Sequence, residues 1–155
     1  MIRKIPNETK HFHFFNANPK NNRTDDCVIR AIATATGKSW DEVLLDLTAF
    51  AQKYKLMPND KKCYGKYLES LGWNKNKQPR KDDNTKYTGK EFCEILDSFD
   101  REYILDYKGS SDCVLAHIGG CHIVCIKPHK GKYKVFDIWD STRGSIGNFW
   151  TKGQK

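Results

Sequence analysis

Hydrophobic residues in the first two thirds of the chain recur with the period of an α-helix. Residues 27–36 are apolar nearly all round, with Arg30 as the exception, and this pattern is typical of a buried helix. Two aspartates precede the segment and can accept hydrogen bonds from the free N–H groups at a helix start. Gly37 suits the left-handed position just past the end. The pattern therefore predicts a buried helix that begins at Cys27.

Three further segments have helical spacing or helix-capping residues. Residues 39–54 and 88–99 each open with a Ser or Thr that is followed three residues later by Glu, which is the spacing of a capping box. Residues 59–72 form a shorter candidate that ends at Gly72. The helical part of the chain is therefore expected over about residues 25–100.

After residue 100 the pattern changes to the period of β-strands. Four segments are short, rich in Val, Ile, Tyr and Phe, and separated by turn residues. These segments are residues 102–108, 112–118, 121–128 and 132–140. The last two read as a hairpin, and a further short strand is expected around residues 148–150. Helices followed by strands predict an α+β fold, with flanking helices packed on a C-terminal antiparallel sheet over about residues 101–151.

Residues 73–90 contain Pro79, many polar residues and no apolar periodicity, which predicts a loop. Basic residues in this segment outnumber its two aspartates, and the whole chain has a net charge of +8. A positive charge of this size favours weak attraction to polyanions without specifying nucleic acid. The Lys75–Lys90 part of the loop is the candidate surface for such binding.

Long apolar runs are absent from the sequence. The hydrophobic stretches are too short for a transmembrane helix, so we expect no membrane partner. The basic N-terminus lacks the apolar region of a signal peptide, and the chain is therefore expected in the cytoplasm. A reducing cytoplasm would keep the six cysteines as thiols.

A set of Cys and His residues recurs at every fourth position in the last third of the chain. The set is Cys113, His117, Cys121, Cys125 and His129. A helix would align these residues, but two glycines and a proline interrupt the segment and its β-branched residues favour strands. Strands would scatter the set, and the chain has no tight Cys-x-x-Cys pair in this region. We therefore predict no metal site and no cofactor.

Cys27 stands at the first turn of the predicted buried helix. The partial positive charge of a helix N-terminus stabilises a thiolate and lowers the pKa of the thiol. Because the thiolate is the reactive form of cysteine, this position makes Cys27 a candidate nucleophile. The alternative is that Cys27 is a small buried apolar residue.

His122 opens the predicted strand that follows a Gly-Gly-Cys turn, where a polar residue can border a cleft. A hairpin turn centred on residues 130–131 would pair His122 with Trp139 and place Asp137 diagonally on the same face. A slip of one residue in register would place Asp140 on that face instead. Either carboxylate could hold one imidazole nitrogen of His122 and so orient the ring.

The other histidines and cysteines give weaker arguments. His117 ends a predicted strand and is the rival candidate for the base. His11 and His13 alternate with phenylalanines in a strand-like run, and we expect them to be exposed. Cys63 and Cys93 lie in predicted helices and are expected to be buried or semi-buried.

The chain resembles the papain-like cysteine protease superfamily. A cysteine that begins a buried helix, a histidine that opens a late strand and an Asp in the neighbouring strand follow the order of that superfamily. More narrowly, "DCVIRAIATATGKSW", "CHIVCI" and "FDIWDST" are similar to segments of small proteins of bacteria and their phages. The resemblance covers the helix start and the last third of the chain. The chain departs from the superfamily in two motifs: it has no Cys-Trp pair at the nucleophile, and it has no Asn-Ser-Trp motif around the third catalytic position.

The resemblance implies a single papain-like domain over residues 1–155 and a triad of Cys27, His122 and Asp137, with Asp140 as the alternative third member. Asn21 holds the position of an oxyanion-binding amide, where many members have Gln, and would act with the N–H of Cys27. The implied reaction is hydrolysis of a peptide, isopeptide or other amide bond in a peptide or protein substrate. Transfer of the acyl group to an amine is left open. The implied location is the cytoplasm of a bacterial cell or of a phage-infected host.

A non-enzymatic binding protein on the same fold is the alternative function. Basic residues of the Lys75–Lys90 loop are interleaved with Trp73 and Tyr87, and they could hold an acidic partner or a nucleic acid. The chain carries no motif of a known nucleic-acid-binding module. Sequence alone therefore favours the enzyme and leaves the binder open.

Overall fold

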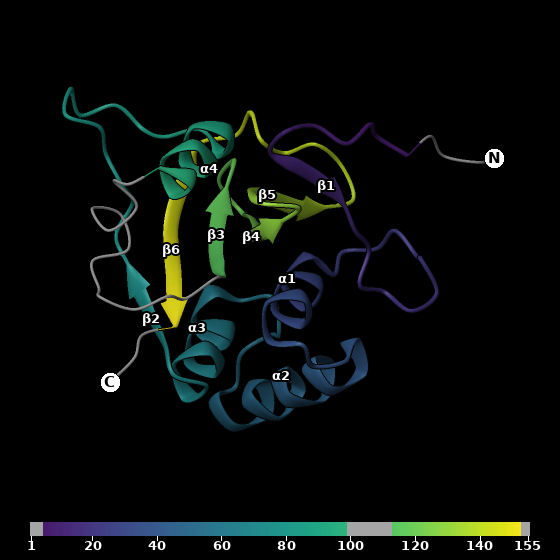
Figure 1. The fold of residues 1–155 in the computed structure, drawn as a ribbon. Helices are drawn as coiled ribbons and strands as arrows, with labels where there is room; N and C mark the ends of the chain where they lie inside the picture. The colour runs from purple at the N-terminus through teal and green to yellow at the C-terminus, as the bar shows by residue number, and fades with distance from the viewer. Residues whose placement is uncertain (1–4, 99–112, 153–155) are drawn as a thin grey trace.

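The protein has an α+β architecture in the computed structural model, which describes residues 5–98 and 113–152 (Figure 1). The described residues contain four helices: α1 (Cys27–Thr36), α2 (Trp40–Tyr54), α3 (Lys61–Ser70) and α4 (Gly89–Asp97). They also contain six strands: β1 (Phe12–Phe14), β2 (Trp73–Asn76), β3 (Val114–Ile118), β4 (His122–His129), β5 (Lys132–Asp137) and β6 (Ile146–Lys152). The strand predicted at residues 102–108 lies outside the described residues.

The strands form one mixed sheet in the order β1-β5-β4-β3-β6-β2. Neighbouring strands are antiparallel except for β1 and β5, which run parallel. The prediction of a purely antiparallel sheet from the C-terminal third is therefore wrong at both edges, where β1 and β2 come from earlier parts of the chain. Short edge strands depend on pairing with a neighbour more than on residue propensity, so the sequence signals them weakly.

β2 also corrects the prediction that residues 73–90 are entirely a loop. Trp73 is 4 % exposed, and β2 pairs with β6 in the register Trp73↔Lys152 to Asn76↔Phe149. The burial of one large aromatic side chain fixes this segment, although its polar neighbours Asn74 and Lys75 are exposed. Four further basic residues lie between β2 and α4, whereas Lys90 lies in the first turn of α4.

Helices cover both faces of the sheet, as Figure 1 shows. α1, α2 and α3 pack with Leu115, Ile123 and Cys125 in one hydrophobic cluster, while α4 packs with Val114 and Val124 in another. Neighbouring residues of one strand thus enter opposite clusters, as the alternation of side chains along a strand requires. α1 lies directly on β4 and is buried, as predicted. This packing holds the first turn of α1 close to the first residue of β4.

Capping residues fix three of the helix ends. Thr88 and Glu91 form the complete predicted capping box of α4. Ser39 accepts a hydrogen bond from the N–H of Glu42 at 3.1 Å, which caps α2. Gly37 ends α1 in the left-handed conformation with φ 76°. The helix boundaries predicted from these residues are confirmed.

His11 is buried, which corrects the expectation that it is exposed. Its side chain is 3 % exposed, and its Nδ1 donates to the carbonyl oxygen of Tyr133 at 3.0 Å. β1 lies against β5 and brings His11 to within 3.8 Å of Asp97 at the end of α4. The burial of His11 beneath α4 could not be predicted from the local alternation of His and Phe.

Among the helices in residues 5–98 and 113–152, none has the length and the apolar character that a membrane-spanning helix needs.

Candidate active site

Cys27 is the first residue of α1 and is partly exposed. The preceding residue, Asp26, occupies the N-cap position, but its side chain makes no capping hydrogen bond. Its carboxylate is instead bound by other side chains, so the first N–H groups of the helix have no side-chain acceptor at this position. The sulfur of Cys27 therefore lies beside a helix N-terminus whose partial positive charge favours a thiolate.

His122 is the first residue of β4, and the register of the β4–β5 hairpin confirms the predicted turn. Cys125 pairs with Phe136 and His129 pairs with Lys132, so the turn is centred on residues 130–131. Continuation of this register places His122 opposite Trp139, and their ring centroids are 5.2 Å apart. Trp139 is 49 % exposed, and it covers one side of the imidazole ring.

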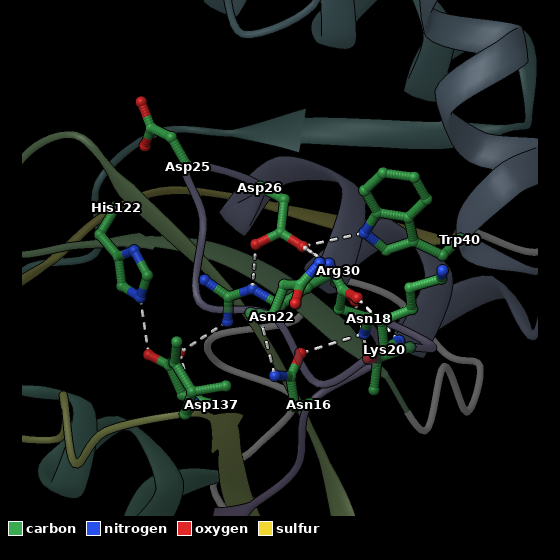
Figure 2. A network of polar contacts seen from close by, with 12 residues as sticks. Asn16, Asn18, Lys20, Asn22, Asp25, Asp26, Arg30, Trp40, His122 and Asp137 are labelled. Atoms are coloured by element: carbon green, nitrogen blue, oxygen red, sulfur yellow. Dashed lines mark hydrogen bonds and ion pairs between the residues drawn. The ribbon is translucent and has the colours of Figure 1, made fainter. Parts of the chain in front are cut away.

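Asp137 is the carboxylate that holds His122. Its Oδ2 accepts a hydrogen bond from Nε2 of His122 at 2.6 Å, as Figure 2 shows. Asp137 is the last residue of β5 and is 1 % exposed. Three further donors bind its carboxylate: the N–H of Ile138 at 2.8 Å, Oγ of Ser141 at 2.8 Å and Nη1 of Arg30 at 3.2 Å. A buried carboxylate with this many donors has a fixed orientation.

Asp140 does not contact His122. Its Oδ1 accepts hydrogen bonds from the N–H and the hydroxyl of Thr142 at 3.1 and 2.6 Å, which forms a local turn. The structure therefore brings Asp137, and not Asp140, to His122. The reason is the hairpin register, because a slip of one residue would be needed to bring Asp140 onto the same face.

The charges of Cys27 and His122 are coupled. Burial works to raise the pKa of Cys27, but hydrogen bonds from His122 and from the N–H of Ile123 outweigh it and hold this pKa below its ordinary value. Burial works to lower the pKa of His122, but its hydrogen bonds with Asp137 and Cys27 raise this pKa to about 9. Because Nε2 binds Asp137, Nδ1 is the nitrogen left to face the sulfur. These shifts favour a thiolate paired with an imidazolium.

Arg30 joins the first turn of α1 to the strand that carries Asp137. It is 7 % exposed, and its Nε donates to Oδ1 of Asp26 at 2.7 Å while Nη1 binds Asp137. Oδ2 of Asp26 accepts hydrogen bonds from Trp40 at 2.9 Å and from Asn18 at 3.2 Å (Figure 2). None of these residues was predicted to belong to the site. One charged residue in an apolar helix was the signal that could have identified Arg30.

Asn21 lies in an exposed turn before α1. Its backbone has φ 55°, and its N–H donates to the carbonyl oxygen of Asn18 at 2.9 Å. Within the described residues its side chain makes no hydrogen bond to Cys27 or His122. The structure therefore does not join Asn21 to the Cys27–His122–Asp137 group, and its role at an oxyanion stays a prediction.

His117, the rival base, belongs to a separate buried pair. Its Nε2 lies 2.6 Å from the hydroxyl of Tyr64, and its ring packs edge-on against Trp150. Burial lowers the pKa of His117 to about 4. The Cys and His residues that recur at every fourth position do not all lie together. Cys125 is buried beside Cys113 at an Sγ–Sγ distance of 3.2 Å, whereas Cys121 is exposed.

Comparison with known proteins identifies no relative. No family model matches the chain, and neither a curated protein nor a solved structure matches it. The function is therefore inferred from the geometry of the site. A thiol at a helix start, an imidazole that lowers its pKa and a buried carboxylate hydrogen-bonded to that imidazole are the groups that nucleophilic acyl transfer requires.

Proposed function

We propose that this protein is a papain-like cysteine hydrolase that cleaves a peptide, isopeptide or other amide bond. The observation that carries the proposal is the 2.6 Å hydrogen bond between His122 and the buried carboxylate of Asp137, together with the interaction by which Cys27 and the same imidazole shift each other's pKa. A histidine placed between a thiol and a carboxylate in this way has the general acid–base arrangement of a catalytic triad. The order of the three residues along the chain supports the papain-like assignment.

The proposed reaction has two half-reactions. In the first, the Cys27 thiolate attacks the carbonyl carbon of the substrate, and the His122 imidazolium gives its proton to the leaving amine as the C–N bond breaks. In the second, neutral His122 takes a proton from water, the resulting hydroxide attacks the thioester, and the C–S bond breaks to release the carboxylic acid and restore the Cys27 thiolate. Asp137 orients the ring and stabilises the imidazolium in both. An amine in place of water would give acyl transfer.

The oxyanion of the tetrahedral intermediates needs hydrogen-bond donors. The N–H of Cys27 is the first candidate, because Cys27 begins α1 and the first N–H groups of a helix have no acceptor within the helix. Asn21 is the proposed second donor, on the basis of its position six residues before the nucleophile. Its exposed side chain would have to turn toward the sulfur when substrate binds.

Burst kinetics with an activated p-nitrophenyl ester tests the proposed function. We expect a burst of up to one p-nitrophenolate per chain, because acylation of Cys27 precedes slower hydrolysis of the thioester. Cys27→Ala should abolish the burst, whereas Cys121→Ala, at an exposed cysteine, should retain it. A burst that survives in Cys27→Ala would contradict the proposal.

A second candidate function is binding of an acidic partner, and a groove lined by residues of α3, β2 and β6 supports it. The groove has a volume of about 350 Å³ and is lined by residues that include Lys61, Lys62, Lys75, Trp73 and Trp150. Nζ of Lys75 lies 6.0 Å from the ring centroid of Trp150, and the buried indole N–H of Trp73 has no acceptor among the described residues. These are groups that could hold a polyanion.

The predicted binding loop itself is less available than its composition indicates. Lys81 pairs with Glu91, and Arg80 donates to Gln78 and to the backbone of Asn84. Titration with a short polyphosphate separates this function from the first. Binding that weakens steeply between low and moderate salt, and that is equal in wild type and Cys27→Ala, would favour the binder.

A further inference from the structure

A cluster of metal-ligating side chains lies apart from the Cys27–His122–Asp137 group. Glu8, His13 and His129 each offer one ligand atom, and these atoms all lie within 4.8 Å of one another. Glu8 belongs to the stretch before β1, His13 lies in β1, and His129 ends β4. These residues are far apart along the chain, and no spacing within residues 113–129 or in the N-terminal segment predicts that they meet.

One oxygen of Glu8 lies close to both imidazoles. Oε1 of Glu8 accepts a hydrogen bond from Nδ1 of His13 and lies 3.9 Å from Nε2 of His129. The two imidazole rings are stacked, with centroids 4.0 Å apart and planes inclined by 29°. Ligand atoms of a tetrahedral zinc ion with bonds of about 2.0–2.1 Å lie about 3.4 Å apart. The ligand atoms lie within 4.8 Å of one another, and rotation of the two imidazoles out of their stack would bring one ion into the plane of both rings.

The surroundings fix Glu8 and keep the cluster open to solvent. Nζ of Lys134 lies 3.5 Å from Oε2 of Glu8, which leaves Oε1 for a metal ion. The side chains of His13 and His129 are 23 % and 28 % exposed, so an ion and a water ligand can enter. The positive charge of Lys134 repels a metal ion bound to Glu8. Because of this repulsion, we expect tight binding only when all three side chains coordinate the ion.

Metal binding needs deprotonated ligands. A bound ion would therefore take the place of the proton in the hydrogen bond between Nδ1 of His13 and Oε1 of Glu8.

We propose that Glu8, His13 and His129 bind one divalent transition-metal ion, for which zinc is the best fit, and that the ion joins the N-terminal segment to the end of β4. Two imidazoles, one carboxylate and a water form a common zinc ligand set. β1 contributes three paired residues to the edge of the sheet, and the N–H of Phe15 donates to the carbonyl oxygen of Asp137 at 3.0 Å. The ion would therefore stabilise the strand beside Asp137. This inference does not depend on the proposed hydrolase activity.

Calorimetric titration with zinc alone tests the site. We expect one equivalent to bind to the wild-type protein and to raise its melting temperature. Glu8→Gln, His13→Gln and His129→Gln should each weaken zinc binding by more than about 100-fold, because each removes a direct ligand. Glu42→Gln removes an exposed carboxylate of α2 that is not part of the cluster, and it should bind zinc as the wild type does.

Cobalt distinguishes this cluster from the cysteines, which also attract zinc. Cobalt bound by nitrogen and oxygen ligands lacks the intense near-ultraviolet band of a cobalt–thiolate bond. We expect the wild-type protein to bind cobalt without that band. A strong thiolate band, zinc binding that is unchanged in the three ligand variants, or no binding at millimolar zinc would each overturn the proposal.

Discussion

Arg30 and Asp137 are joined by a buried hydrogen bond of 3.2 Å across 107 residues of sequence. Arg30 also binds Asp26, the residue before Cys27, at 2.7 Å. One guanidinium therefore connects the helix that presents the thiol to the strand that orients His122. Two buried carboxylates share this guanidinium, so its removal would leave both without their charged donor.

Arg30→Met should therefore destabilise the protein strongly. Removal of one partner from a buried ion pair costs about 3–5 kcal/mol, because the remaining charges lose their compensation. Urea unfolding followed by circular dichroism measures the loss. The matched control is Lys38→Met, which removes a more exposed ion pair with Glu42 and should have a much smaller effect. If the two variants lose the same free energy of unfolding, the buried ion pairs of Arg30 contribute no more to stability than an exposed pair.

Asp137→Asn should reduce acylation by the p-nitrophenyl ester by at least about 100-fold. The amide keeps the size of the side chain but loses the charge that stabilises the His122 imidazolium. Asp140→Asn should retain nearly all of the activity, since Asp140 binds Thr142 and not His122. The burst rates of the two variants show which carboxylate orients His122. A larger loss of rate in Asp140→Asn than in Asp137→Asn would contradict the assignment of Asp137.

The rate of acylation should depend on pH as a bell. The reactive form has Cys27 deprotonated and His122 protonated, so it is present above the lowered pKa of Cys27 and below the pKa of His122. Activity should fall as the pH rises through about 9, where His122 loses its proton. In Asp137→Asn this alkaline limb should move to lower pH, because the hydrogen bond that raises the pKa of His122 is weakened. An alkaline limb at the same pH in both proteins would mean that Asp137 does not control His122.

Asn21→Ala tests the proposed oxyanion donor. Loss of one donor from an oxyanion site typically slows acylation by about 100- to 1,000-fold. Asn22→Ala changes the adjacent exposed amide and should have little effect on the same burst rate. If the two variants react alike, the oxyanion is bound without Asn21.

The sequence predicted the local parts of this site well. Helical spacing and Gly37 located α1, although the side chain of Asp26 does not cap its first turn, and turn residues at 130–131 predicted one register that places Asp137 near His122, with Asp140 as the alternative. Both are short-range signals, since a hairpin and a helix start depend on nearby residues. Buried α1 and the late strands were predictable for the same reason.

Long-range partners could not be predicted in this way. The role of Arg30 depends on Asp26 and Asp137 meeting in space, and no periodicity encodes that meeting. The edge strands β1 and β2 likewise form because β5 and β6 offer unpaired edges, and their own residues carry a weak strand signal. The sequence allowed either Asp137 or Asp140 to face His122, and the register of the β4–β5 hairpin selects Asp137.

The rate of alkylation of Cys27 at pH 6 shows directly whether His122 holds this thiol as a thiolate. Iodoacetamide labelling followed by mass spectrometry compares Cys27 with Cys121, which is exposed and therefore a better reference than the buried Cys63 or Cys93. We expect Cys27 to react at least about 10-fold faster than Cys121, because a thiolate is already present, and we expect His122→Gln to remove this advantage. If Cys27 reacts no faster than Cys121 in the wild-type protein, Cys27 is not an activated nucleophile.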